Sequence, residues 1–147
     1  MTRPLFVGVG NSYRSDDGVG PWLAQALAKA GRGAQVHGGD GTGLIDLFGQ
    51  HSDLVILDAT LSGRPAGTLT RIDAMDGPVP AELFHYSTHR FGVAEAIETA
   101  RALGMLPERL VLYGIEGASF AAGCDLSDPV ARAAQDLLET LMTRPAD

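Results

Sequence analysis

The chain has a single cysteine, Cys124, and a single lysine, Lys29, among its 147 residues. One thiol excludes an internal disulfide framework and any zinc site built from several thiolates. The 11 basic residues are outnumbered by 18 acidic ones, and the net charge of −7 argues against nucleic-acid binding and against binding to anionic lipid. Long apolar runs are also missing: none reaches membrane-spanning length, and the first, residues 5–9, is too short for a signal peptide. We therefore expect an acidic, soluble protein of the cytoplasm that binds neither nucleic acid nor membranes.

What the chain does contain is the composition of an ordinary globular domain, with 45% hydrophobic and 20% charged residues. A chain of this length buries roughly 70% of the surface that it exposes when unfolded, which is enough for folding without disulfides or a structural metal. No internal repeat, linker or low-complexity tract divides it. The prediction is one domain over residues 1–147.

Apolar patterning predicts strands that alternate with helices. Apolar runs predict strands over residues 3–10, 34–37, 54–57, 68–72 and 110–115. Of these, residues 68–72 are expected to form an edge strand or one arm of a hairpin. Apolar residues spaced three and four apart predict helices over residues 19–30, 43–48, 93–103 and 130–141. The pattern for residues 43–48 is weak, and that helix is expected to be short. The intervening residues 73–86, rich in proline and glycine, are expected to form a loop.

This alternation predicts an α/β fold, namely a three-layer α/β/α sandwich with a mostly parallel twisted sheet and one antiparallel edge strand. Asp16 or Asp17 is expected to cap the first long helix, and Asp128, followed by Pro129, to cap the last. The carboxyl ends of parallel strands meet along one rim of such a sheet, and ligands bind there. Candidate functional residues are therefore sought at that rim.

The loop that follows the first strand has the sequence GVGNSYRSDDGVG, residues 8–20. Its opening GxG resembles the start of a dinucleotide-binding loop, but Tyr13 stands where the third glycine of that motif belongs. Asp16 and Asp17 also place negative charge where the N-terminus of the helix would meet a pyrophosphate. A nucleotide site is therefore rejected.

Carboxylates and one histidine remain as candidates for chemistry at the rim. One of the adjacent Asp16 and Asp17 is sufficient to cap a helix, so the second is available for another role. Asp58 closes a buried apolar strand, where a carboxylate needs a partner, and a structural hydrogen bond to a neighbouring loop explains it as well as a functional role does. His89 follows a long loop and is able to reach the same rim. Two carboxylates and one imidazole with open coordination positions describe a transition-metal site of modest affinity.

Other hydrolytic machinery is missing from the sequence. It contains neither the GxSxG motif of a serine nucleophile nor the HExxH motif of a zinc protease. Cys124 has Asp125 as its neighbour, and an acidic neighbour disfavours the thiolate that a cysteine nucleophile requires.

Five blocks, in order along the chain, resemble the hydrogenase maturation proteases, which trim the C-terminal extension of the [NiFe]-hydrogenase large subunit. The resemblance runs from about Leu5 to Leu141, nearly the whole chain. Each block is weakly diagnostic, whereas five in the right order and spacing are specific. The blocks are GVGNSYRSDDGVGPWLA (8–24), GGDGTG (38–43), VILDA (55–59), STHRFGVAEAI (87–97) and LVLYGIEGASFAAGCDLS (110–127).

The resemblance implies that Asp17 and Asp58 are the two metal-contacting carboxylates and that His89 is the imidazole beside them. The Asp-Asp-Gly form is similar to the branch that acts on formate-hydrogenlyase-type hydrogenases, whereas other branches carry glutamate at position 17. Gly117 stands where many members have proline, so the resemblance supports the family assignment but does not extend to the detailed path of the loop behind Gly117.

The resemblance also implies an activity, a partner and a cofactor. The chain is expected to be an endopeptidase, and a monomer, whose partner is the [NiFe]-hydrogenase large-subunit precursor. The nickel is expected to be carried by that substrate, so that no resident cofactor is needed and cleavage follows nickel insertion. A metal-polarised carbonyl attacked by water, assisted by Asp17 or Asp58, fits the side chains available.

Two alternatives stay open at this point. A nickel-binding scaffold or chaperone that does not cut would share the same ligands. A receiver-like signalling domain, phosphorylated on Asp58, also has paired acids after its first strand, but it requires a lysine near the end of a late strand, and Lys29 is far from that position.

Overall fold

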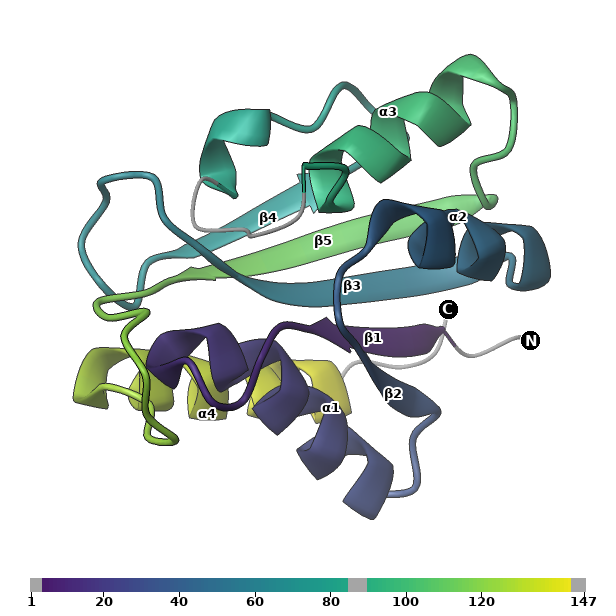
Figure 1. Ribbon diagram of the computed structural model, residues 1–147. Coiled ribbons are helices and arrows are strands. Elements are labelled where there is room, and N and C mark those ends of the chain that lie inside the picture. Colours follow the sequence, from purple (N-terminus) through teal and green to yellow (C-terminus); the bar gives the residue numbers. More distant parts are fainter. Residues whose placement is uncertain (1–3, 85–89, 144–147) are drawn as a thin grey trace.

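A five-stranded sheet in the order β2-β1-β3-β5-β4 forms the middle layer of the described part of the chain (Figure 1). The computed structural model describes residues 4–84 and 90–143. Neighbouring strands are parallel except at one edge, where β4 runs antiparallel to β5. The strands are β1 (Leu5–Val9), β2 (Ala34–His37), β3 (Asp53–Thr60), β4 (Leu69–Asp73) and β5 (Arg109–Glu116). The predicted mostly parallel sheet with one antiparallel edge strand is thereby confirmed.

Helices cover both faces of this sheet. In Figure 1, α1 and α4 lie together on one face, whereas α2 and α3 lie together on the other. The helices are α1 (Val19–Lys29), α2 (Gly41–Gln50), α3 (Val93–Ala102) and α4 (Asp128–Thr143), with short 3-10 turns η1 (Ser15–Gly18) and η2 (Ala81–Leu83). This arrangement is the predicted three-layer α/β/α sandwich. None of the described helices has the length and apolar character required to cross a membrane.

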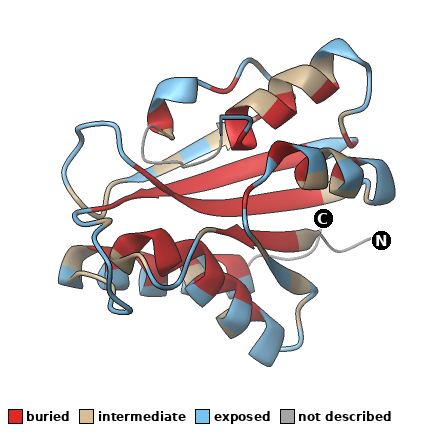
Figure 2. Cartoon of the chain, viewed as in Figure 1, coloured by how far each residue is buried: buried red, intermediate tan, exposed pale blue. Residues whose placement is uncertain are grey.

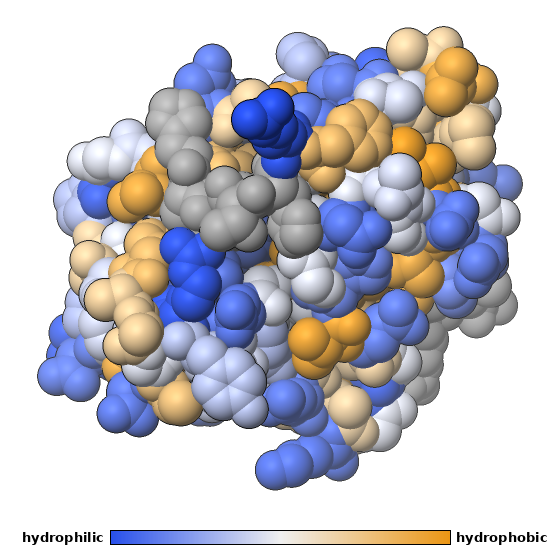
Figure 3. Space-filling view, viewed as in Figure 1, coloured by the Kyte–Doolittle hydropathy of each residue, from blue (hydrophilic) through white to orange (hydrophobic). Residues whose placement is uncertain are grey.

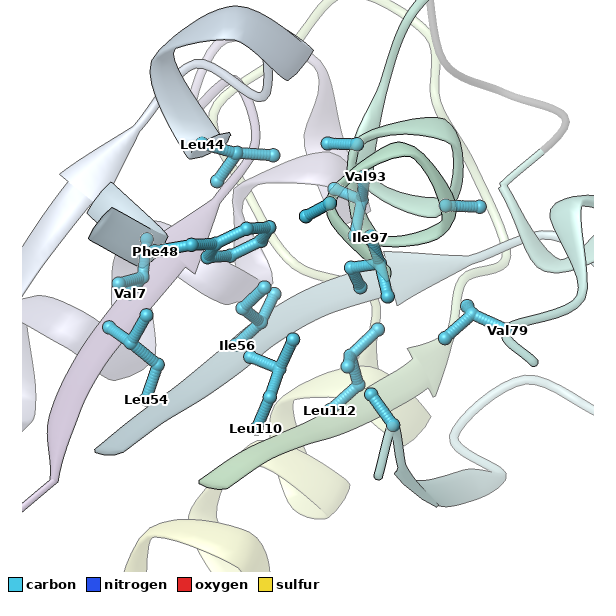
Figure 4. Close-up of a cluster of buried hydrophobic side chains, with 14 of the residues drawn as sticks. Val7, Leu44, Phe48, Leu54, Ile56, Val79, Val93, Ile97, Leu110 and Leu112 are labelled. Atoms are coloured by element: carbon cyan, nitrogen blue, oxygen red, sulfur yellow. The ribbon is translucent and has the colours of Figure 1, made fainter. Parts of the chain in front are cut away.

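Each face of the sheet has its own apolar core, because side chains alternate along a strand. On β3, Leu54 and Ile56 belong to the cluster under α2 and α3, which Figure 4 shows in close-up. Val55 and Leu57 of the same strand belong to the cluster under α1 and α4. Burial on both faces explains why this strand is a continuous apolar run, and Figure 2 shows the central strands almost entirely buried.

Two glycines bring α1 close to the strands. A Cβ at Gly8 in β1 would overlap the carbonyl oxygen of Gly20 in α1, and a Cβ at Gly20 would overlap the carbonyl oxygens of Val9 and Leu57. The first turn of α1 therefore lies directly against β1 and β3. This close contact places η1, which immediately precedes α1, over the carboxyl ends of both strands.

The observed boundaries differ from the sequence predictions in several places. Residue Gly18, not Asp16 or Asp17, occupies the N-cap position of α1, and no side chain caps it. The prediction for Asp128 is also wrong, since α4 begins at Asp128 itself and the N–H of Ala131 donates to the carbonyl of Ser127. Helix α2 and strand β3 are longer than predicted, and Asp40 caps α2 by accepting a hydrogen bond from the N–H of Gly43 at 2.9 Å.

Candidate active site

A cavity of about 410 Å³ opens at the carboxyl ends of β1, β2 and β3. Its walls come from the loop after β1, the end of β2, one residue of β3 and the segments on either side of residues 85–89. The lining residues are Val9, Gly10, Asn11, Ser12, Tyr13, Arg14, Asp17, Val36, Gly38, Gly39, Asp58, Phe84 and Val93. This is the rim at which the sequence predicted a ligand site.

Asp17 is held at this rim by the tight turn that follows β1. Its side chain is buried, with an exposed fraction of 4% for the residue, and its Oδ2 accepts a hydrogen bond from the N–H of Asn11 at 3.0 Å. The Oδ1 of Asn11 in turn accepts from the N–H of Tyr13 at 2.9 Å, which closes the turn. The loop therefore presents a positioned carboxylate to the cavity.

Asp58 enters the same cavity from β3. It lies within the strand and not after its end, on the same side as Ile56, and its exposed fraction is 3%. Its Oδ1 accepts a hydrogen bond from the N–H of the next residue, Ala59, at 2.8 Å. The structure thus brings together two of the three predicted site residues, Asp17 and Asp58, as lining residues of one cavity.

His89, the third predicted residue, lies outside the described residues. Phe84, which precedes the stretch 85–89, and Val93, which follows it by four residues, both line the cavity. On the far side, the carbonyl of Phe91 accepts a hydrogen bond from the N–H of Gly41 at 2.7 Å, which fixes that segment to the start of α2. A role for His89 stays a prediction.

Asp16 has a different role from its neighbour. Its carboxylate is fully buried away from the cavity lining and accepts four hydrogen bonds. The donors are the N–H groups of Ala118 (2.7 Å), Ser119 (3.0 Å) and Ser127 (2.7 Å) and the hydroxyl of Ser127 (2.9 Å). Asp16 therefore ties the loop after β1 to the loop between β5 and α4 instead of capping α1.

Ser15 strengthens the same connection between loops. Its backbone is in the left-handed region, with φ of 52°, which is unfavourable for a residue with a side chain. Its N–H donates to the carbonyl of Gly123 and its hydroxyl donates to the carbonyl of Ala121, each at 2.8 Å. These contacts hold the strained turn that sets the position of η1.

Glu116, at the end of β5, is a buried carboxylate that the sequence analysis did not single out. It accepts hydrogen bonds from the hydroxyls of Thr60 and Ser62 and from the N–H of Ser62, each at 2.8 Å, and from the N–H of Gly63 at 3.2 Å. Burial pushes the pKa of Glu116 upward, but these hydrogen bonds together outweigh burial and hold the pKa below its ordinary value. Its position at the end of a continuous apolar run, like that of Asp58, was the available signal.

Three charged side chains are among the described residues that line the cavity. Arg14 is the cation among the lining residues that the structure describes, and Asp17 and Asp58 are the carboxylates. Across residues 4–84 and 90–143, no three histidine, cysteine, aspartate or glutamate side chains gather as a metal site. The described residues by themselves therefore do not assemble the predicted set of three ligands.

The fold and the cavity together define an α/β protein with a rim site built on two buried carboxylates from separate strand-end segments. The model of a family described as "Hydrogenase maturation protease" matches residues 23–144. The chain belongs to the hydrogenase maturation protease family, as the resemblance in sequence implied.

Individual relatives agree with this assignment. The chain is 29% identical over 119 residues to the hydrogenase expression/formation protein HupD of Rhizobium leguminosarum bv. viciae, a match that covers 78% of this chain and 59% of HupD. It is 28% identical over 148 residues to the hydrogenase 2 maturation protease of Escherichia coli, covering 95% of this chain and 88% of that protein. The solved structure of the hydrogenase maturating endopeptidase HybD from E. coli superposes with a TM-score of 0.76 at 26% identity, covering 95% of this chain and 90% of HybD. The chain thus spans little more than half the length of HupD.

Proposed function

We propose that the protein is an endopeptidase that removes the C-terminal extension of a [NiFe]-hydrogenase large-subunit precursor after nickel has been inserted. The observation that carries the proposal is the placement of Asp17 and Asp58, two buried carboxylates, in the wall of one open cavity. Membership of the hydrogenase maturation protease family supports the reaction class. The proposal assigns the reaction to the cytoplasm, in keeping with the sequence expectation.

In this proposal the nickel is part of the substrate. Carboxylate oxygens and an imidazole nitrogen are suitable ligands for such an ion, so Asp17, Asp58 and His89 would contact nickel that the large subunit already holds. Three protein ligands leave coordination positions for groups of the substrate. The arrangement favours softer divalent ions over Mg²⁺, and it would let the enzyme distinguish a nickel-loaded precursor from an empty one.

The chain's own residues account for the remaining requirements of hydrolysis. Asp17 is oriented by the N–H of Asn11 and Asp58 by the N–H of Ala59, so each carboxylate is held in place in the cavity wall. Either carboxylate is able to accept a proton from the attacking water. Arg14, also in the wall, supplies a positive charge beside a carbonyl oxygen that becomes negative during the attack.

The proposal is tested by combining two precursors with two preparations of the protein. Nickel-loaded and nickel-free precursor are each incubated with untreated protein and with protein that has been treated with chelator and desalted, and the intact mass of the large subunit is measured. We expect cleavage of the nickel-loaded precursor by both preparations and none of the nickel-free precursor. If untreated protein cleaved both precursors and chelator-treated protein cleaved neither, the protein would instead be an ordinary metalloprotease.

Variants separate cleavage from mere binding. Asp17→Asn, Asp58→Asn and His89→Ala are each expected to abolish cleavage, whereas Asp46→Asn, an exposed carboxylate on α2, serves as the matched control with wild-type activity. A wild-type protein that binds the nickel-loaded precursor without shortening it would instead be a scaffold or chaperone. Normal trimming by His89→Ala would remove His89 from the site.

A further inference from the structure

The outer edge of β2 is open within the described part of the chain. Strand β2 pairs with β1 along one side only and lies at the margin of the sheet in Figure 1. Its burial is low for a strand, and Val36 has an exposed fraction of 47%. A strand at the edge of a sheet presents backbone N–H and C=O groups to which another chain is able to pair.

The register of the β1–β2 pair identifies those outward groups. The N–H of Phe6 donates to the carbonyl of Gly33, and the N–H of Gly10 donates to the carbonyl of His37. In a parallel ladder with these bonds, Gln35 and His37 direct their N–H and C=O groups toward β1, and the alternate residues Ala34 and Val36 direct theirs outward. Ala34 and Val36 therefore offer two N–H donors and two C=O acceptors along the outer edge, with the spacing that a neighbouring strand requires.

The residues of β2 do not protect this edge. Natural edge strands are blunted by charged side chains, proline or bulges, and the sequence Ala-Gln-Val-His of β2 has no Lys, Arg, Asp, Glu or Pro. The opposite edge differs, since β4 carries Arg71 and Asp73. Figure 3 shows apolar and hydrophilic residues interspersed over one face of the molecule.

The open edge leads into the candidate active site. Val36 and the following Gly38 and Gly39 form part of the cavity wall, as does the loop that holds Asp17. A peptide that leaves the cavity at this point meets the carboxyl end of β2 first. It would then run back along β2 in the antiparallel direction, which is the direction that forms the more stable pair.

We propose that the C-terminal extension of the substrate adds to the sheet as an antiparallel strand on the outer edge of β2, with the backbone groups of Ala34 and Val36 as its partners. This inference rests on the proposed function, because it names the occupant of the edge as the segment that is cut off. Backbone pairing recognises an extended chain with little regard to its side chains, and the cavity then receives the residues at the scissile bond. The paired strand orients the peptide bond relative to Asp17 and Asp58.

The first test follows amide exchange in the wild-type protein by NMR. The probe is a synthetic peptide with the sequence of the extension, added in excess. We expect exchange of the Val36 amide to slow about tenfold when roughly nine-tenths of the protein is in complex, while the Gln35 amide, already bonded to β1, is unchanged. An unchanged Val36 rate at saturation would overturn the proposal. Protection of Val36 in the free protein that rises with protein concentration would show self-pairing of two copies, and would overturn it as well.

The second test removes the outward donor. Val36→Pro deletes the N–H that faces away from β1 and leaves the ladder with β1 intact, as proline is tolerated on a strand edge in this orientation. We expect KM for the nickel-loaded precursor to rise about fivefold with kcat unchanged, the loss that follows from one hydrogen bond. The melting temperature of each variant is measured alongside.

The opposite edge provides the matched control. Leu69 in β4 has an exposed fraction of 48%, and the bonds from Glu116 to Thr68 and from Ala74 to Leu110 place its N–H on the outer side of that strand. Leu69→Pro is therefore the same kind of change away from the cavity, and its KM is expected to equal that of the wild type. Equal KM values for both proline variants would overturn strand addition while leaving the proposed function standing. A wild-type protein that fails to cleave would remove the proposed function, and with it the named occupant.

Discussion

Ser127 donates two hydrogen bonds to the carboxylate of Asp16, from its N–H to Oδ1 at 2.7 Å and from its hydroxyl to Oδ2 at 2.9 Å. The two residues are 111 positions apart in the chain, so this contact joins the loop before α1 to the start of α4. Asp17, the next residue, lines the cavity instead. Of the two adjacent carboxylates, one thus holds the loops together and the other lines the cavity.

The first prediction concerns this division. Asp16→Ala leaves four donors without their acceptor, and we expect it to lower the free energy of unfolding by about 2–4 kcal/mol. Urea denaturation followed by circular dichroism measures the change. Asp125→Ala, in an exposed part of the same loop, is the control and is expected to stay within about 0.5 kcal/mol of wild type. Equal stability of the two variants would refute the tethering role.

The second prediction concerns how the free energy of unfolding falls at acid pH. The pKa of Glu116 is lower in the folded protein than its ordinary value, so the unfolded chain binds the proton more readily. The stabilisation is therefore fully present above the ordinary glutamate pKa of about 4.5 and is lost as the pH falls through the lower, folded value. Glu116→Gln should flatten the decline of unfolding free energy below pH of about 4.5, as measured by urea titrations at several pH values.

The wild-type decline has other contributors, and the comparison with Glu116→Gln takes them into account. A hydrogen bond from the Arg101 side chain lowers the pKa of Glu98, and one from the N–H of Gly43 lowers the pKa of Asp40. Both groups act in the same direction as Glu116 and are present in both proteins. Parallel curves for wild type and variant would show that Glu116 does not contribute.

Most of the fold was predictable from the sequence, because apolar period and glycine or proline boundaries are local signals. The strands and helices lie where the patterns indicated, and the antiparallel edge strand is confirmed. The errors are at the ends: the N-cap of α1 was assigned to Asp16 or Asp17, although Asp16 is bonded to a loop more than a hundred residues away. An aspartate just before a helix is able either to cap that helix or to bond to a distant loop. The sequence is the same in both cases, so it does not distinguish the two roles.

The third prediction tests the close approach of α1 to the sheet. Gly20→Ala introduces a Cβ that overlaps backbone oxygens of β1 and β3, and we expect a loss of about 1–3 kcal/mol in unfolding free energy. Gly49→Ala is the matched change in α2, where the space is open, and it should stabilise the protein by about 0.5–1 kcal/mol. Thermal melts of both variants give the comparison, and a Gly20→Ala protein as stable as Gly49→Ala would contradict the packing.

The fourth prediction separates two neighbouring leucines of α4. Leu137 is buried against the sheet, whereas Leu138 is half-buried at the margin of the same cluster. Leu137→Ala is expected to lower the unfolding free energy by about 2–5 kcal/mol, and Leu138→Ala by clearly less. Both residues fit the helical spacing of the apolar positions in α4, and only the packing of α4 against the sheet distinguishes them. The order of the two losses in urea denaturation is the check.

The candidate site was partly predictable for a different reason. The rim position of carboxylates near the ends of apolar strands indicated Asp16, Asp17 and Asp58, and the family resemblance selected Asp17 over Asp16. The cavity contains Asp17 and Asp58. Glu116 was missed, although it too ends an apolar strand, because its partners Thr60 and Ser62 come from another strand and its loop. The assignment of His89 remains a prediction.

The loop that carries Cys124 has a practical use. The thiol is exposed, it is the single cysteine of the chain, and the neighbouring Gly123 exchanges backbone hydrogen bonds with Tyr13 and Ser15 at the rim of the cavity. A maleimide dye therefore attaches at one defined point, without any engineered residue, and it sits close to the turn that lines the site. Changes in its emission during mixing with a precursor would time the arrival and departure of the large subunit, separately from the cutting itself.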